Sequence, residues 1–177
     1  MKEIRESVRS EYESARSAFH TLLGSLSEED LKAKSNNPGW TNGEILFHVT
    51  LGFHVLLALL PMARFFAHLP KIFSRLFAGL LNSMTWFFNP VNAAGTRGGS
   101  KIYRRHNIGR KFDRVIDSLL KKLASVKETE WQMGMYYPTK WDPLFDQFMT
   151  LEKLFHYPVI HFNFHLKQIS SGRKVLL

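Results

Sequence analysis

The chain has 177 residues, of which 45% are hydrophobic and 22% charged, and its formal net charge is +9 at pH 7. This length is typical of one domain, so we expect residues 1–177 to form a single folded unit. The sequence contains eight His and no Cys. The lack of cysteine excludes disulfides, thiolate zinc sites, iron–sulfur clusters and a cysteine nucleophile, so any metal ion must be held by nitrogen and oxygen ligands.

Positive charge alone would suit a nucleic-acid partner, but most of the basic residues lie far apart in the sequence. Their densest cluster lies between Lys101 and Arg114, and no base-reading motif accompanies it. A nucleic-acid partner is therefore not favoured. The N-terminal segment MKEIRESVRSEYESAR has no apolar core of the kind that a signal peptide requires. We expect a cytoplasmic protein.

The first predicted helix runs from about Glu3 to Leu23, because apolar residues recur there at spacings of three and four with charged residues between them. Gly24 ends this helix. Ser27 precedes three acidic residues and indicates a short helical turn that ends near Lys34. The apolar stripe of the first helix consists of Ile4, Val8, Tyr12, Ala15, Phe19 and Leu22.

A loop rich in Ser, Asn, Pro and Gly precedes the second predicted helix. Thr41 and Glu44 then form a T-x-x-E capping box, in which each side chain accepts a hydrogen bond from the backbone N–H of the other residue. Proline ends a helix by removing a donor. The second helix is therefore predicted to begin at Asn42 and to run to about Leu60, just before Pro61.

The second helix is apolar nearly all round from 45 to 63, which raises the question of a membrane span. A span needs about 20 apolar residues with few interruptions, and no second clean span is present to pair with this one. A helix buried at the centre of a bundle has the same composition, so we favour a core helix. Polar residues, glycine and proline interrupt the segment at His48, Thr50, Gly52, His54 and Pro61.

The next segment, 62–90, is crowded with phenylalanine and leucine and carries Arg64, Lys71 and Arg75 as its only charges. It could form a core helix, a cover over a cavity, or a helix on a membrane surface with a basic rim. We favour a core or cover role for this segment. A membrane surface is a possible partner but is not favoured. The Gly-rich segment 89–100 is predicted to be a loop.

A third helix is predicted over 101–126, followed by a connection over 128–140. The last helix is predicted to begin at Asp142, with Pro143 at its first position, and to run to Ile169. No segment shows a convincing strand pattern. The sequence therefore predicts an all-α fold, a four-helix bundle with an extra apolar helical segment between the second and third main helices.

Two histidines of the last predicted helix, His161 and His165, are four residues apart and so project from the same face. This spacing lets two imidazoles bind one metal ion, as in the H-E-x-x-H motif, although the glutamate that serves metalloproteases as a base is absent. Two polar residues on an amphipathic helix would show the same spacing. The pair alone does not decide between these interpretations.

His48 is the third candidate ligand, because it lies among apolar residues of the second helix and a buried imidazole must be hydrogen-bonded or ligated. Three neutral imidazoles with open positions suit Zn, Ni, Fe or Mn. His54 lies six residues further on, about 240° round the helix, so it cannot face the same site. The other histidines rank lower, and no residue is identified as a catalytic acid or base.

Three segments resemble the DinB-like (YfiT-like) superfamily in order and spacing: LSEEDL at 26–31, GWTNGEILFHV at 39–49 and HFNFHLKQI at 161–169. The superfamily carries W-[ST]-x-x-E-x-x-x-H at the start of its second helix and H-x-x-x-H-x-x-Q-I on its last. The resemblance implies a four-helix bundle with one divalent metal ion held by three histidines. Carried over position by position, these ligands are His48, His161 and His165.

Characterised members of the superfamily that this chain resembles include bacillithiol and mycothiol S-transferases and a mycothiol-dependent maleylpyruvate isomerase. The resemblance implies a metal-dependent enzyme acting on a small molecule, as a hydrolase or as a transferase of an external thiol such as bacillithiol or mycothiol. It also implies a homodimer. The segment 62–100 departs from the simplest family pattern and bears on substrate identity. The alternatives are a non-catalytic metal-binding or stress-response module and, less favoured, a peripheral membrane protein.

Overall fold

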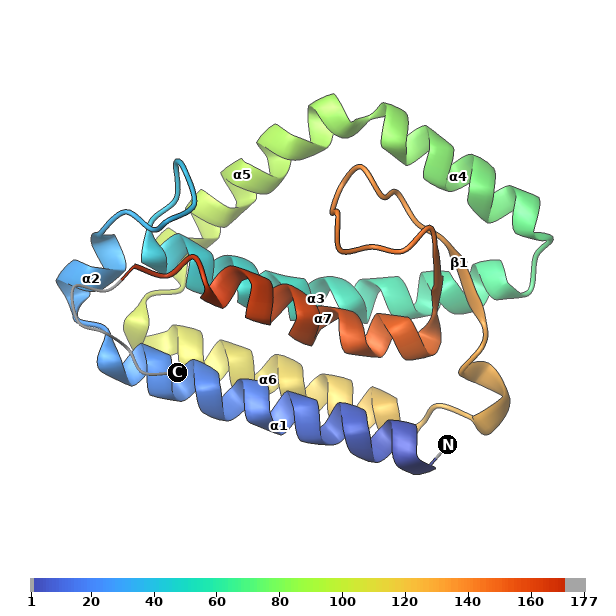
Figure 1. The fold of residues 1–177 in the computed structure, drawn as a ribbon, viewed down its shortest axis with the longest axis horizontal. Helices are drawn as coiled ribbons and strands as arrows, with labels where there is room; N and C mark the ends of the chain where they lie inside the picture. Colours follow the sequence, from blue (N-terminus) through green and yellow to red (C-terminus); the bar gives the residue numbers. More distant parts are fainter. Residues whose placement is uncertain (1, 171–177) are drawn as a thin grey trace.

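The computed structural model describes residues 2–170, which form a mainly helical protein with one short β-hairpin (Figure 1). The all-α prediction is confirmed, although the predicted single domain over 1–177 extends beyond the described residues at both ends. The elements in chain order are α1 (Lys2–Ser25), α2 (Glu28–Lys32), α3 (Asn42–Ala67), α4 (Lys71–Ser83), α5 (Thr85–Ile102), α6 (Arg105–Ala124), the 3₁₀-helix η1 (Glu128–Glu130), β1 (Gly134–Tyr136), β2 (Phe148–Thr150) and α7 (Leu151–Leu166).

The core of the bundle lies where α1, α3, α6 and α7 pack together. Phe112 of α6 stacks on Phe19 of α1, with ring centroids 4.2 Å apart. Its ring centroid also lies 5.1 Å from that of Phe53 in α3 and 5.9 Å from that of Phe162 in α7. All four rings are buried. One aromatic residue from each main helix thus meets at the centre, which holds α3 and α7 side by side.

The start of α3 is built as the sequence predicts. Thr41 Oγ1 accepts a hydrogen bond from the Glu44 N–H (3.2 Å), and Glu44 Oε2 accepts one from the Thr41 N–H (2.7 Å). The end of α3 differs from the prediction, because the helix continues through Pro61 instead of ending at Leu60. Pro61 removes one backbone hydrogen bond, but Leu60 and Ala63 are buried. Tertiary packing on both sides of the proline outweighs that loss.

The Gly-rich segment 89–100, predicted to be a loop, belongs to α5, so that prediction is wrong. Glycine and proline disfavour an isolated helix, but here α5 packs against α3. Thr96 is fully buried, and a Cβ atom built on Gly99 would overlap the ring of Phe47. Glycine thus lets the two helices approach closely, and packing decides the conformation of this segment.

Gly99→Ala is expected to destabilise the fold by about 1–3 kcal/mol, as overpacking does in a filled core. The ring of Phe47 has little room to move, because it is buried and stacks on Tyr103 with centroids 5.8 Å apart. Gly98→Ala meets open space and is expected to stabilise the helix by about 0.5–1 kcal/mol. Urea unfolding measures both variants, and equal effects would contradict the close approach of α5 to α3.

The β-hairpin was not predicted from the sequence. β1 pairs antiparallel with β2, with Gly134 opposite Thr150 and Tyr136 opposite Phe148. Each strand has three residues, which is too short for an alternating pattern to be recognised. The hairpin packs against α3 and α4, so it ties the connection before α7 to the bundle.

The last helix begins at Leu151 rather than near Asp142, so the predicted start is wrong. Asp142 Oδ1 accepts a hydrogen bond from the Leu144 N–H (2.8 Å), which closes a turn two residues on instead of capping a helix. The actual N-cap is Thr150, whose side chain accepts a hydrogen bond from the Lys153 N–H (3.2 Å). Asp142 is thereby left in a loop beside α7.

The predicted extra apolar segment between the second and third main helices forms α4 and α5, which arch over the side of α3 that faces away from α1 and α6 (Figure 1). The chain turns at 103–104, so α6 begins at Arg105 and not at Lys101. By length and composition alone, α3 could cross a membrane, but 56% of its most apolar window is buried inside the protein. A core helix has the same composition.

Candidate metal centre

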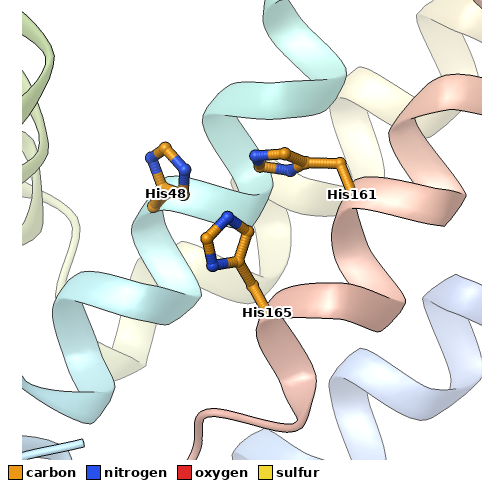
Figure 2. Close-up of side chains that lie close together, drawn as sticks. All are labelled: His48, His161 and His165. Carbon is orange, nitrogen blue, oxygen red and sulfur yellow. The ribbon is translucent and has the colours of Figure 1, made fainter. Parts of the chain in front are cut away.

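The structure brings the three candidate histidines together, with His48 on α3 and both His161 and His165 on α7 (Figure 2). One ring nitrogen from each lies within 4.8 Å of the others. The ring centroids are 4.5 to 4.9 Å apart. Figure 2 shows the three rings converging on the space between the two helices. The i, i+4 pair therefore faces the third histidine across the α3–α7 contact.

Burial keeps these imidazoles neutral. His161 and His165 are buried, and His48 is partly buried beneath Trp40, whose ring centroid lies 4.6 Å away. Burial, together with the neighbouring His165, lowers the pKa of His48 to about 3. Burial and the other two histidines hold the pKa of His161 well below its usual value. A neutral imidazole is the protonation state that a metal ion binds.

Gln168 fixes the orientation and tautomer of His165. Its Oε1 lies 2.8 Å from His165 Nδ1 and also accepts a hydrogen bond from Asn37 Nδ2 at 3.0 Å. Because an amide oxygen only accepts hydrogen bonds, Nδ1 of His165 carries the proton. The lone pair on Nε2 is therefore free for a ligand. Metal-binding histidines in proteins are held in this way by an acceptor at the second nitrogen.

His161 lies against the backbone of Gly52. A Cβ atom at Gly52 would be 2.8 Å from His161 Nδ1, so only glycine lets the imidazole approach α3 this closely. Nδ1 is buried and has no hydrogen-bond partner among the described residues. The other nitrogen, Nε2, lies 3.8 Å from Asp142 Oδ2. Three neutral imidazoles, one with an unpartnered nitrogen, fit a divalent ion such as Zn, Ni, Fe or Mn.

Asp142 is a site residue that sequence reasoning missed. Besides its position near His161 Nε2, its Oδ2 accepts a hydrogen bond from the Tyr157 hydroxyl at 2.6 Å. Tyr157 lies four residues before His161, on the same helix. In the sequence, the Asp-Pro pair resembled a helix start, and no other signal connected this carboxylate with the histidines. The structure places a carboxylate, held at both oxygens, beside the cluster.

The histidines open on a cavity of about 610 Å³ between α3, α5, α7 and the loop that carries Asp142. Its wall includes residues of the segment 62–100, which the sequence analysis connected with substrate identity. Among the lining residues in the described part of the chain, Asp142 is the only carboxylate. The other lining residues are mainly apolar and include Leu51, Val55, Leu59, Phe88, Val91 and Trp141. Such a cavity suits a small apolar ligand.

Three of the remaining histidines make contacts elsewhere in the bundle. His54 Nδ1 lies 3.1 Å from the Thr50 carbonyl oxygen. His156 Nδ1 lies 2.7 Å from a carboxylate oxygen of Glu11 in α1. His20 Nε2 lies 2.8 Å from a carboxylate oxygen of Asp113 in α6. None of these three belongs to the cluster.

The fold and the cluster define a class of protein: a helical bundle in which three histidines lie close enough together that they could hold a metal ion. The sequence model of the DinB superfamily matches residues 11–169. Because this match covers most of the chain, the protein belongs to the DinB superfamily, as the resemblance predicted. No curated protein and no solved structure matched the chain.

Proposed function

We propose that the protein is a divalent-metal-dependent enzyme that transfers an external low-molecular-weight thiol to a small apolar electrophile. Hydrolysis of a small molecule is the alternative reaction at the same site. The observation that supports the proposal is the opening of three neutral imidazoles on an apolar cavity that contains one carboxylate. Because the chain has no cysteine, the sulfur must come from another molecule, such as bacillithiol or mycothiol.

In this proposal His48, His161 and His165 hold the metal ion. Such an ion, when bound, supplies positive charge that favours the deprotonated form of a thiol or water beside it. The Asp142 carboxylate accepts the proton that the thiol releases. The Tyr157 hydroxyl orients one oxygen of this carboxylate and the Leu144 N–H orients the other.

The apolar wall of the cavity would hold the electrophile and exclude water from the reacting atoms. The thiol S–H bond breaks as its proton passes to the carboxylate, and the sulfur forms a bond to an electrophilic carbon. The leaving group departs with the electron pair of its bond. The chain's own residues thus bind the substrate, receive the proton and exclude water.

The test compares untagged wild-type protein with a His161→Ala/His165→Ala variant by elemental analysis. The wild-type protein is expected to retain a divalent ion and the variant to lose it. A His68→Ala/His106→Ala variant is the matched control, because both of its substituted histidines are exposed. Equal metal content in the wild-type protein and the His161→Ala/His165→Ala variant would contradict the site.

Conjugation assays with bacillithiol, mycothiol, coenzyme A and glutathione test the reaction itself. Activity is expected in the wild-type protein and the control variant, and is expected to be lost with the metal. A folded, metal-loaded protein that is inert toward every thiol and ester tested would instead support the non-catalytic metal-binding module.

A further inference from the structure

The net charge of the chain is confined to one segment. Residues 45–112 contain nine basic residues and no Asp or Glu, whereas the remaining fifteen basic residues are matched by the fifteen acidic residues of the chain. This acid-free segment comprises most of α3, all of α4 and α5, and the start of α6. The formal charge of +9 therefore belongs to one part of the fold rather than to the whole surface.

The helices α4 and α5 expose large apolar residues and bury small ones. A helix on the surface of a globular protein normally buries its large apolar residues. Here the buried residues are small, namely Ser74, Ala78 and Thr96, while the side chain of Leu76 is 65% exposed and that of Trp86 is 76% exposed. We define the α4–α5 surface by six exposed residues: Ile72, Phe73, Leu76, Leu80, Trp86 and Phe87.

Basic side chains without acidic partners lie beside this surface. Lys71 Nζ lies 5.1 Å from the ring centroid of Phe148. The Arg75 guanidinium lies 4.7 Å from the ring centroid of Tyr136 and donates a hydrogen bond to its hydroxyl oxygen at 2.8 Å. Within residues 2–170, Arg64 is the only one of the nine basic residues that pairs with a carboxylate. The rings hold Lys71 and Arg75 without neutralising their charge.

We propose that the α4–α5 surface docks on an anionic lipid membrane. A large exposed apolar patch marks an interaction site, and two properties of this one determine its partner. Its leucine, isoleucine and aromatic side chains match the boundary between headgroups and acyl chains. Its uncompensated Lys and Arg residues match the negative charge of anionic headgroups.

Charge complementarity distinguishes the membrane from the other occupants. A second copy of the chain docked by the same surface would bring two acid-free segments together, which like-charge repulsion opposes. A nucleic acid would neutralise the basic residues, but it would leave the six apolar side chains facing phosphates. An anionic bilayer can take up the apolar side chains at its acyl boundary and attract the basic side chains through its headgroups.

The docked orientation would place the cavity next to the lipid. Phe88 and Val91 of α5 line the cavity, while Trp86 and Phe87 on the same helix belong to the exposed surface. The helix that walls the cavity would therefore also contact the membrane, which favours an apolar, membrane-partitioned ligand. The docking itself does not depend on the proposed metal chemistry.

Co-sedimentation of the full chain with vesicles tests the proposal. The protein is expected to pellet with vesicles of phosphatidylcholine mixed with phosphatidylglycerol, to stay in solution with phosphatidylcholine alone, and to be released by salt. Lys71→Glu/Arg75→Glu is expected to weaken binding by at least about tenfold. Lys121→Glu/Lys122→Glu on α6 makes the same change in net charge far from the surface and is expected to have a much smaller effect.

A second pair of variants tests the apolar contact. Leu76→Ser is expected to weaken binding to the mixed vesicles, whereas Ile160→Ser, at an exposed apolar residue of α7, is expected to leave binding unchanged. Thermal unfolding confirms that each variant is folded. No binding to the anionic vesicles, or equal effects within either pair, would overturn the proposal. So would retention on duplex DNA in place of vesicles, or a dimer in solution that Leu76→Ser dissociates.

Discussion

In the metal-free protein, the free energy of unfolding is expected to fall steeply as the pH drops from about 6.5 toward 3. The fold lowers the pKa of His48 from 6.5 to about 3, mainly by burial and also through the neighbouring His165. In this window the unfolded chain binds a proton at His48 that the folded chain does not, so stability rises with pH. Below about pH 3 both states are protonated and this contribution to the slope ends.

Each such histidine contributes about 1.4 kcal/mol per pH unit. Burial lowers the pKa of His161 and, less strongly, that of His165, so all three act in the same direction. Because native proteins are stable by only about 5–15 kcal/mol, the metal-free protein is expected to unfold in mild acid.

Urea unfolding after chelation, repeated between neutral and acidic pH, measures this slope. Carboxylates contribute to acid unfolding as well, so the comparison that isolates the site is His48→Gln. This variant is expected to have a slope smaller by about 1.4 kcal/mol per pH unit. An unchanged slope would show that His48 is not held neutral by the fold.

The meeting of the three histidines could be anticipated from the sequence because it depends on local rules. A helix places His161 and His165 on one face, and the capping box at Thr41 sets where α3 begins and hence where His48 lies. The remaining step, that α3 faces α7, came from the resemblance to the superfamily. The contact between Gln168 Oε1 and His165 Nδ1 spans only three residues and is local as well, whereas the hydrogen bond that Gln168 accepts from Asn37 depends on the position of a distant loop, which spacing does not encode.

The features that sequence reasoning missed depend on packing between distant segments. The helical state of Gly99 is explained by the ring of Phe47, which is 52 residues away in the chain. Likewise, the periodicity of α4 shows an apolar stripe but does not show that Ser74 faces inward and Leu76 outward. Asp142 reaches the cluster because an aspartate turn replaced the expected helix start.

Asp142→Asn is expected to lower the rate of the proposed thiol transfer by about 10²–10⁴-fold, the usual effect of losing a positioned proton acceptor. The amide keeps the shape of the side chain, and its single oxygen can still accept the hydrogen bond from the Leu144 N–H, while its NH2 group can donate to the Tyr157 hydroxyl oxygen; the amide is a poor base. The metal content is expected to stay unchanged, because the three imidazoles remain.

Rate measurements across pH, made together with elemental analysis, separate the roles that Asp142 could play. As a proton acceptor, it should give the wild-type rate a dependence on a basic group that Asp142→Asn removes. Tyr157→Phe, which removes the hydrogen bond to Oδ2 but keeps the carboxylate, is the matched control and should cause a smaller loss. A wild-type rate in Asp142→Asn would exclude it as the base, whereas loss of metal from this variant would make Asp142 a fourth ligand.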